Sequence, residues 1–373
     1  MFNLPNTNWK PKLLAFGMSV LALTASAQNN FNSLELNLQK SIGLFSADNH
    51  KLQGEAYGGE ISYHINTIRS RSAWIQDLGV KSVDFIFNYK NMDQINRVLV
   101  PIKGEYGDSY ALLGGITLPL LHVGKASLDF APAFGLLYAS ETWFTNQNPL
   151  LGSKLNFAAR AALKLNVPVA EKTALTASLD ILHYSNGGFR VPNNGMNLAN
   201  LGIGVKQYLN FKSGNESKST DVDNSYAKHS FDFGVGVGRR GVYKSKDFLY
   251  RTGLYLGYNY RFASYMAIGT GVDAVYYHTL YDVNRNAETY QSNATSLARW
   301  RVGAAVGPDF WMGDLAIMAK YGYYIYYDSL KPIKTYWTAG AKYKLNNWLA
   351  LQGKIYIHQT EADYIGFGLM FTK

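Results

Sequence analysis

The sequence predicts an all-β protein whose antiparallel strands cross a membrane and close into barrels, and three observations lead to this prediction. After residue 27, no apolar run approaches the roughly 18 residues that a membrane-spanning helix needs. The chain carries 28 Tyr and 35 Gly with 47% hydrophobic residues, which suits strands that are apolar only at alternate positions. It has no cysteine, so an exported form needs another source of stability, and a closed hydrogen-bonded barrel supplies one.

Residues 1–27 have the pattern of a secretory signal peptide. Two lysines precede an apolar run from Leu13 to about Ala25, and Ala-Ser-Ala at 25–27 is an A-x-A cleavage site. The run is too short to span a bilayer, so we expect cleavage rather than anchoring and Gln28 as the first mature residue.

The charge of the chain favours a lipid partner over a nucleic acid. The formal net charge is +10, and removing the two lysines of the signal peptide, which has no acidic residue, leaves +8. For an exported protein we expect anionic outer-membrane lipid to meet this charge. The sequence has no basic helix and no aromatic–basic RNA-binding motif, so no nucleic-acid partner is predicted.

The first half of the mature chain, residues 28–211, reads as about eight strands, the number of a small outer-membrane barrel. In the stretch at 126–140, apolar residues at even positions alternate with small or polar residues at odd positions, as expected for a lipid-facing and a lumen-facing side. Short turns near 122–125 and 169–172 alternate with longer connections at 141–154 and 187–195, which places the latter loops on the outer side. The predicted strands are 32–41, 56–69, 81–92, 108–121, 126–140, 155–169, 173–186 and 196–210.

A polar linker, residues 212–229, separates this half from a second set of about eight strands in residues 230–373. Two tandem eight-stranded barrels and a single barrel of about sixteen strands both fit the pattern, and the length of the linker favours two. Tyr323, Tyr324, Tyr326 and Tyr327 are predicted to join an aromatic girdle. The predicted strands are 230–240, 250–262, 264–278, 298–310, 313–327, 332–344, 347–358 and 363–372.

The two halves end alike, which suggests a tandem duplication. Ile-Leu-His-Tyr-Ser at 181–185 compares with Tyr-Ile-His-Gln-Thr at 356–360, and Leu-Gly-Ile-Gly-Val at 201–205 with Ile-Gly-Phe-Gly-Leu at 365–369. The second copy lacks the loop between these segments, so we expect it to be degenerate. His358 is predicted to face the lumen in a structural role.

The segment His-Tyr-Ser-Asn-Gly-Gly at 183–188, followed by Pro-Asn-Asn-Gly-Met-Asn at 192–197, is the candidate site. His183 and Ser185 lie two residues apart and therefore share one face of a strand, which brings together a base and a nucleophile for acyl transfer. Leu179 and Ile181 share that face, whereas Ser178 and Asp180 share the other. Because the apolar face of a membrane strand meets lipid, we expect His183 and Ser185 to point outward.

Residues 183–197 resemble the outer-membrane lipid A 3-O-deacylases of the PagL family, which carry H-x-S-N, a P-N-x-G segment and a following Glu. The resemblance covers about 30 residues, 181–210. It implies an eight-stranded barrel in the bacterial outer membrane, lipid A (lipopolysaccharide) as the substrate, Ser185 as the nucleophile and His183 as the general base. It makes Asn186, Asn193 and the amides of Gly187 and Gly188 candidate oxyanion donors.

This chain departs from the family at one position: Asn197 stands where the family has its catalytic Glu. A carboxylate orients the histidine and stabilises its charged form, whereas an Asn carbonyl can only orient it, as in Cys-His-Asn sites. We expect Asn197 to fill that role. No cofactor is predicted, and the scattered histidines show no metal-ligand spacing. The alternative is a non-enzymatic channel or scaffold that carries an inactive deacylase-like site.

Overall fold

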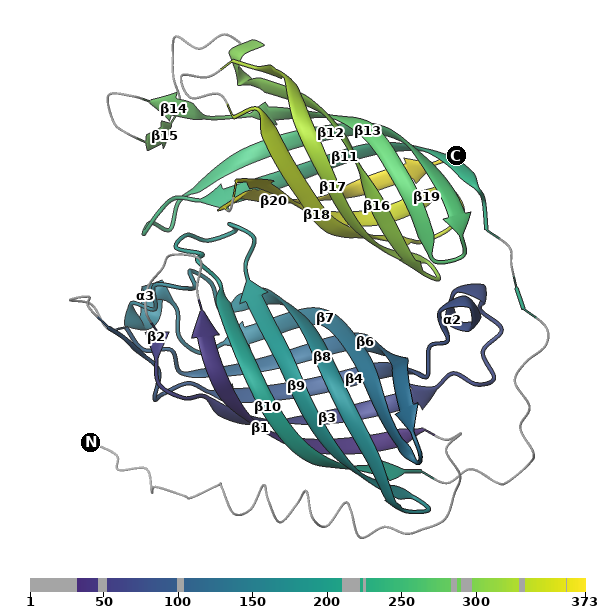
Figure 1. Cartoon of the computed structure of the whole chain (residues 1–373). Coiled ribbons are helices and arrows are strands. Elements are labelled where there is room, and N and C mark those ends of the chain that lie inside the picture. Colours follow the sequence, from purple (N-terminus) through teal and green to yellow (C-terminus); the bar gives the residue numbers. More distant parts are fainter. Residues whose placement is uncertain are drawn as a thin grey trace.

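A computed structural model describes residues 32–45, 52–98, 104–209, 222–223, 226–282, 287–289, 297–328, 333–359 and 361–373. Within them the chain forms two separate closed antiparallel barrels of eight strands each (Figure 1). The first strand of each barrel pairs with the last strand of the same barrel, β1 with β10 and β11 with β20. The prediction of two small barrels is therefore confirmed, and the single large barrel is excluded. The predicted signal peptide and most of the predicted linker lie outside the described residues.

Each of the sixteen barrel strands falls on a predicted one. The first barrel comprises β1 (Ser33–Phe45), β3 (Tyr57–Asn66), β4 (Ser82–Asn91), β6 (Asp108–Val123), β7 (Ala126–Ala139), β8 (Leu155–Ala170), β9 (Thr173–Ser185) and β10 (Met196–Tyr208). The second comprises β11 (His229–Gly241), β12 (Phe248–Ala263), β13 (Met266–Tyr277), β16 (Trp300–Met312), β17 (Leu315–Tyr327), β18 (Thr335–Lys344), β19 (Leu349–His358) and β20 (Glu361–Thr372).

The connections between strands differ at the two ends of each barrel. One end has tight turns, such as those at 124–125, 171–172 and 313–314, and this is the periplasmic end by the usual topology. Longer loops gather at the other, outer end, and they carry the small strand pairs β2 (Leu52–Gln53) with β5 (Asn96–Arg97) and β14 (Leu280–Asp282) with β15 (Ala287–Thr289). In Figure 1 the two barrels lie side by side with their outer ends on the same side.

Two short helices were not predicted: α2 (Ala73–Leu78), at the periplasmic end, and α3 (Trp143–Asn146), at the outer end. A short 3-10 helix, η1 (Leu297–Arg299), precedes β16. No helix in the described part of the chain is long and apolar enough to cross a membrane.

The walls of both barrels alternate as the sequence predicts. Apolar side chains face outward and are exposed, for example Leu112 and Ile203 in the first barrel and Leu256 and Phe367 in the second. Polar side chains of the same strands point into the lumen and are buried. The exposed apolar belt of a closed barrel fits a hydrocarbon environment, where every backbone group must be paired internally.

Ion pairs fill the lumen of the first barrel. Arg160 has a fully buried side chain and lies 2.8 Å from Glu60 and 3.7 Å from Asp180. Lys164 bridges Glu60 and Glu35 at 3.3 and 3.2 Å. These long charged side chains close the middle of the barrel, so the first barrel has the interior of a packed scaffold rather than of an open pore.

Tyrosines pack the lumen of the second barrel. Tyr336 and Tyr356 donate hydrogen bonds to Asp273 at 3.1 and 2.6 Å, and Tyr324 stacks on Tyr336 with 4.5 Å between ring centroids. The prediction that Tyr324 belongs to an outer girdle is wrong, because consecutive strand residues face opposite sides and Tyr324 is the inward one. Tyr323 is exposed, and a shift in register between Tyr324 and Tyr326 leaves Tyr326 exposed as well. Tyr327 packs on Tyr324 with 5.1 Å between ring centroids, so the girdle prediction is wrong for Tyr327 too.

The two barrels touch near both ends. At the periplasmic end, Met312 packs against the apolar cluster around α2, and the hydroxyl of Ser264 donates a hydrogen bond to Asp77. At the outer end, the loop after β9 meets the second barrel: the amide of Gly241 donates to the carbonyl of Gly188 at 2.9 Å, and that of Lys244 to the carbonyl of Val191 at 3.1 Å. The second barrel therefore contacts the segment that the sequence marks as the candidate site.

We expect Arg160→Met to destabilise the first barrel by about 3–5 kcal/mol, because it removes the buried cation that pairs with both Glu60 and Asp180. Lys125→Met, in an exposed periplasmic turn, is the control and should change stability by less than about 0.5 kcal/mol. Urea titration of the detergent-folded protein, followed by the gel mobility of the folded barrel, measures both. Equal stability of the two variants would show that the ion pairs do not hold the lumen.

Candidate active site

Strand β9 holds the candidate site at its outer end. Its alternation is clear: Leu179 and Ile181 are 46% and 50% exposed, whereas Ser178 and Asp180 are buried in the lumen at 4% and 2%. His183 is exposed and Ser185 is half-buried. The predicted orientation is confirmed, since both residues lie on the outer wall, in line with the apolar side chains below them.

The pairing of β9 with β10 brings the histidine and the asparagine together. His183 lies directly opposite Asn197 in the register of the two strands. Its Nδ1 donates a hydrogen bond to the side-chain carbonyl oxygen of Asn197 at 2.8 Å. This bond fixes the tautomer with Nε2 unprotonated, and Nε2 is then the nitrogen available to accept a proton from a nucleophile. Within the described residues, the ring of His183 makes no hydrogen bond to Ser185. Such catalytic hydrogen bonds are often long or absent until substrate binds.

The side chains of His183 and Ser185 both lie close to the backbone of Gly195. A β-carbon added at Gly195 would lie 3.1 Å from Cε1 of His183 and 3.5 Å from Cβ of Ser185. The residue has a φ of +68°, a conformation that glycine adopts without strain. His183 and Ser185 thus flank the same glycine, which leaves room for the imidazole.

The loop between β9 and β10 is held by its own asparagines. Asn186 is 1% exposed, its backbone amide donates to Oδ1 of Asn193 at 2.8 Å, and its side-chain amide donates to the carbonyl of Arg190 at 2.9 Å. The structure therefore uses these groups of Asn186 and Asn193 to shape the loop. A sequence reading cannot separate this use from a role as oxyanion donors, because both need the same residue types in a turn.

Gly187 and Gly188 contribute amides of a different kind. They have φ values of +64° and +82°, and no hydrogen bond of the described residues uses either backbone N–H. A β-carbon at Gly187 would meet Ile355 of the second barrel at 3.0 Å, and one at Gly188 would meet the carbonyl of Ala362 at 3.1 Å. The second barrel thus packs against these two glycines, two and three residues after Ser185.

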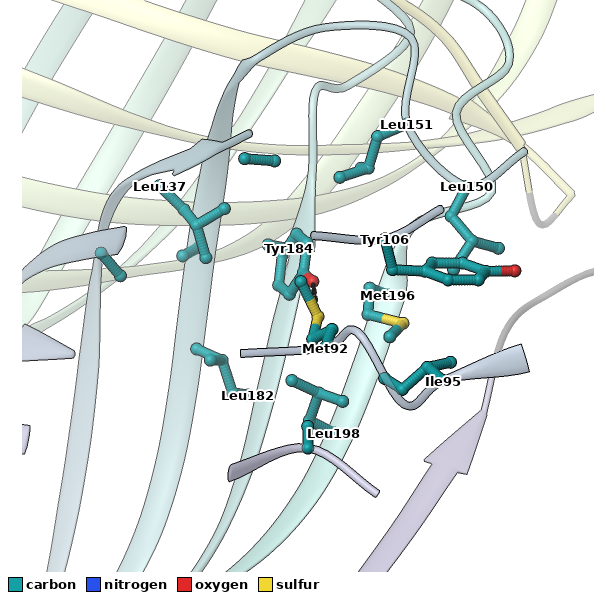
Figure 2. Packing of buried hydrophobic residues seen from close by; sticks show 14 of the residues in the cluster. Met92, Ile95, Tyr106, Leu137, Leu150, Leu151, Leu182, Tyr184, Met196 and Leu198 are labelled. Carbon is teal, nitrogen blue, oxygen red and sulfur yellow. Dashed lines mark hydrogen bonds between the residues drawn. The ribbon is translucent and has the colours of Figure 1, made fainter. Parts of the chain in front are cut away.

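An apolar cluster supports the site from inside the barrel (Figure 2). Leu182 and Tyr184 flank His183 on the lumen side, and Met196 and Leu198 flank Asn197 in the same way; each is at most 1% exposed. The hydroxyl of Tyr184 contacts the sulfur of Met92 at 3.0 Å. Nearby in an outer loop, burial raises the pKa of Tyr106 to about 12, so the cluster stays neutral. Both strands that carry the site are therefore anchored by packed side chains.

The corresponding histidine of the second barrel lies in a different setting. His358 is 9% exposed, faces the lumen, and its Nε2 is 2.7 Å from the hydroxyl of Tyr324. Its ring also lies 3.8 Å from Asp363. The prediction that His358 faces the lumen is confirmed.

Comparisons with known families agree with this fold. Residues 4–206 match the family model of lipid A 3-O-deacylase (PagL), and residues 229–373 match that of the acyloxyacyl hydrolase C-terminal domain. The first match covers more than half of the chain, and it contains the paired His183 and Asn197. The chain belongs to the lipid A 3-O-deacylase (PagL) family of outer-membrane β-barrel proteins.

Solved structures give more distant similarities. The crystal structure of the outer membrane enzyme PagL is 16% identical, with a TM-score of 0.33, and the match covers 47% of this chain and 99% of that one. CdiB from Acinetobacter baumannii is 12% identical, with a TM-score of 0.19 and coverage of 94% and 61%. The siderophore receptor PirA from Pseudomonas aeruginosa is 10% identical, with a TM-score of 0.21 and coverage of 94% and 82%. No curated protein matches the sequence.

We expect Gly195→Ala to impair hydrolysis of an acyl ester much more than it impairs stability, because its new methyl group presses on the His183 ring. Gly124→Ala is the matched control: Gly124 has a φ of +59°, and an added β-carbon would meet nothing within 4 Å. Both variants should lose about 1–2 kcal/mol from the left-handed backbone. Activity assays and urea titration of the pair separate the two effects, and equal activity losses would contradict a role for the space beside His183.

Proposed function

We propose that this chain is an outer-membrane serine esterase that removes an ester-linked acyl chain from lipid A. The observation that carries the proposal is the 2.8 Å bond from Nδ1 of His183 to the carbonyl oxygen of Asn197, made on the lipid-facing wall beside Ser185. A polar pair exposed to lipid is costly, which argues that it has a use. Membership of the lipid A 3-O-deacylase family supports the choice of substrate.

In the proposed reaction the acyl chain lies along the apolar outer wall near Leu179 and Ile181, with its ester at the outer end of β9. Oγ of Ser185 attacks the acyl carbonyl while Nε2 of His183 takes the hydroxyl proton. The tetrahedral intermediate expels the sugar alcohol, which receives that proton from His183. Water activated by His183 then attacks the acyl-enzyme and releases the fatty acid, restoring Ser185.

The oxyanion of the intermediate needs donors that are not already bonded. We assign this role first to the backbone amides of Gly187 and Gly188, because no hydrogen bond among the described residues uses them. Asn186 and Asn193 remain candidates as well, and the contacts they make within the loop support the placement of the two glycine amides. Preorganised donors of this kind contribute about 3–4 kcal/mol each to catalysis in other esterases and proteases.

Mass spectrometry of lipid A incubated with the purified protein tests the reaction. The wild type should produce a species that lacks one ester-linked acyl chain, and Ser185→Ala should leave lipid A at the level of the buffer blank, since it removes the nucleophile. The competing function is a scaffold with an inactive site. Unchanged lipid A in the presence of correctly folded wild type would favour that scaffold and contradict the esterase.

We expect Asn197→Ala to lower the deacylation rate by about 10²- to 10⁴-fold, because His183 loses the acceptor that sets its tautomer. Asn197→Glu should preserve or raise the rate, since a carboxylate orients the ring and also stabilises its charged form. Gln207→Ala is the control: this amide lies on the same strand and accepts a 2.9 Å bond from Thr173 of β9 at the periplasmic end. Equal rates for wild type and Asn197→Ala would rule out the orienting role.

A further inference from the structure

The junction of the two barrels contains an alternating stack of aromatic rings and guanidinium groups. The guanidinium of Arg239, from β11, lies between Phe189 and Phe248, 3.4 and 3.8 Å from the two ring centroids. Arg190 lies over Phe248 and Phe144, with distances of 4.4 and 5.5 Å. Phe144, Phe189 and Arg190 come from the first barrel, and Arg239 and Phe248 from the second, so both barrels build the stack.

This stack adjoins the proposed catalytic loop. Phe189 and Arg190 follow Ser185 by four and five residues, and Nη1 of Arg190 donates to the carbonyl of Lys246 at 3.3 Å. Lys244 lies over Trp143 at 4.4 Å, on the same outer side. Arg190, Arg239, Lys244 and Lys246 thus gather where the loop after β9 meets the loop after β11.

These four cations have no carboxylate partner in the part of the chain that the structure describes. Within the described residues, none of them lies within 4.0 Å of an Asp or Glu oxygen, although most lumen cations do. The nearby Asp247 is bonded to Ser245 at 2.6 Å, and Nε of Arg239 is buried without a hydrogen-bond partner. Bringing like charges together costs free energy unless an anion joins them. Rings cover the faces of both guanidinium groups, so only their edges can bind phosphate oxygens in a forked geometry. One edge N–H of Arg190 is used by Lys246, and the side chain of Arg239 also bonds to Tyr250, which leaves the remaining N–H groups of the two residues for the phosphate.

We propose that Arg190 and Arg239, with Lys244 and Lys246 beside them, form a composite anion site that binds a phosphate group of the glycolipid headgroup while its acyl ester lies at Ser185. This inference rests on the proposed function for the position of the ester. It gives the second barrel a part in the reaction, because three of the four cations belong to it. The second barrel then acts as a headgroup-binding module for the site on the first.

Binding to the full-length Ser185→Ala protein in detergent tests the proposal without turnover. The probes are lipid A with its phosphates and the same lipid A after enzymatic dephosphorylation. We expect the phosphorylated lipid to bind at least about tenfold more tightly, as charge-assisted hydrogen bonds imply. Adding Arg239→Gln should reduce this preference severalfold, whereas Lys125→Gln, which removes one charge at the opposite end, should leave it intact.

Arg239 also packs between two rings, so its replacement could disturb the fold. Folded gel mobility checks this, and Lys244→Gln with Lys246→Gln removes two charges from exposed side chains and should also lower the preference. Inorganic phosphate is the third probe. It should displace phosphorylated lipid A only weakly, because it lacks the acyl contacts, and complete displacement at equal concentration would overturn the headgroup assignment in favour of a free-phosphate site.

The outcomes for the anion site and for the esterase are distinct. Equal binding of both lipids by a protein that deacylates normally would overturn the anion site and leave the proposed function intact. Phosphate-dependent binding by a wild type that never deacylates lipid A would support the site and contradict the esterase. The preference for phosphorylated lipid A could also persist both in Arg239→Gln and in the double lysine variant. The phosphate would then bind elsewhere, and the assignment to these residues would be overturned.

Discussion

The alternation of side chains along β9 is the constraint on which both the chemistry and its membrane setting depend. A shift of one residue in the register would turn His183 and Ser185 into the lumen and expose Tyr184 to lipid. Pairing with β8 and β10 on either edge and the burial of Leu182 and Tyr184 oppose such a shift. The same packing that closes the outer mouth of the barrel therefore also sets the direction of the two residues proposed for catalysis.

The neutral partner of His183 changes the electrostatics of the proposed site relative to the carboxylate of the family. An unpaired carboxylate on a lipid-facing wall is costly before the histidine becomes charged, whereas an amide carries no such cost. Asn197 therefore orients the ring at a smaller cost to the free enzyme, but it provides less stabilisation once the imidazolium forms. In the proposed reaction, the exchange of a carboxylate for an amide therefore lowers the electrostatic contribution to catalysis and keeps a hydrogen-bond acceptor for Nδ1 of His183.

Much of this architecture could be predicted from local patterns in the sequence. Strand periodicity and turn residues are properties of short segments, so all sixteen barrel strands were located, and the strand register then explains why His183 meets Asn197. The two short helices were missed because a segment such as Ala73–Leu78 is too brief to show a helical period. The prediction of an outer aromatic girdle is wrong at Tyr324, because it rested on the clustering of tyrosines and not on the alternation of side chains along the strand.

Long-range contacts were beyond the reach of the same patterns. The partner of Arg160 in the lumen depends on the tilt and stagger with which eight strands close, and no local motif encodes these. The stack of Phe189 with Arg239 joins residues 50 positions apart across the predicted linker. Such contacts appear only once two complete barrels are placed beside each other.

The contact between the barrels also explains how the second barrel can affect a site whose proposed catalytic residues all lie in the first barrel. Contacts near both ends, at Asp77 with Ser264 and at Gly188 with Gly241, oppose rocking of one barrel against the other in the plane of the membrane. The outer contact falls on the loop that carries the amides of Gly187 and Gly188, which make no hydrogen bond within the described part of the chain. Because loops are the least restrained part of a small barrel, a rigid neighbour lowers the conformational entropy that this loop would otherwise lose when it binds the oxyanion of the proposed reaction. Such a support must be rigid, so it requires a barrel with a tightly packed lumen rather than an open one.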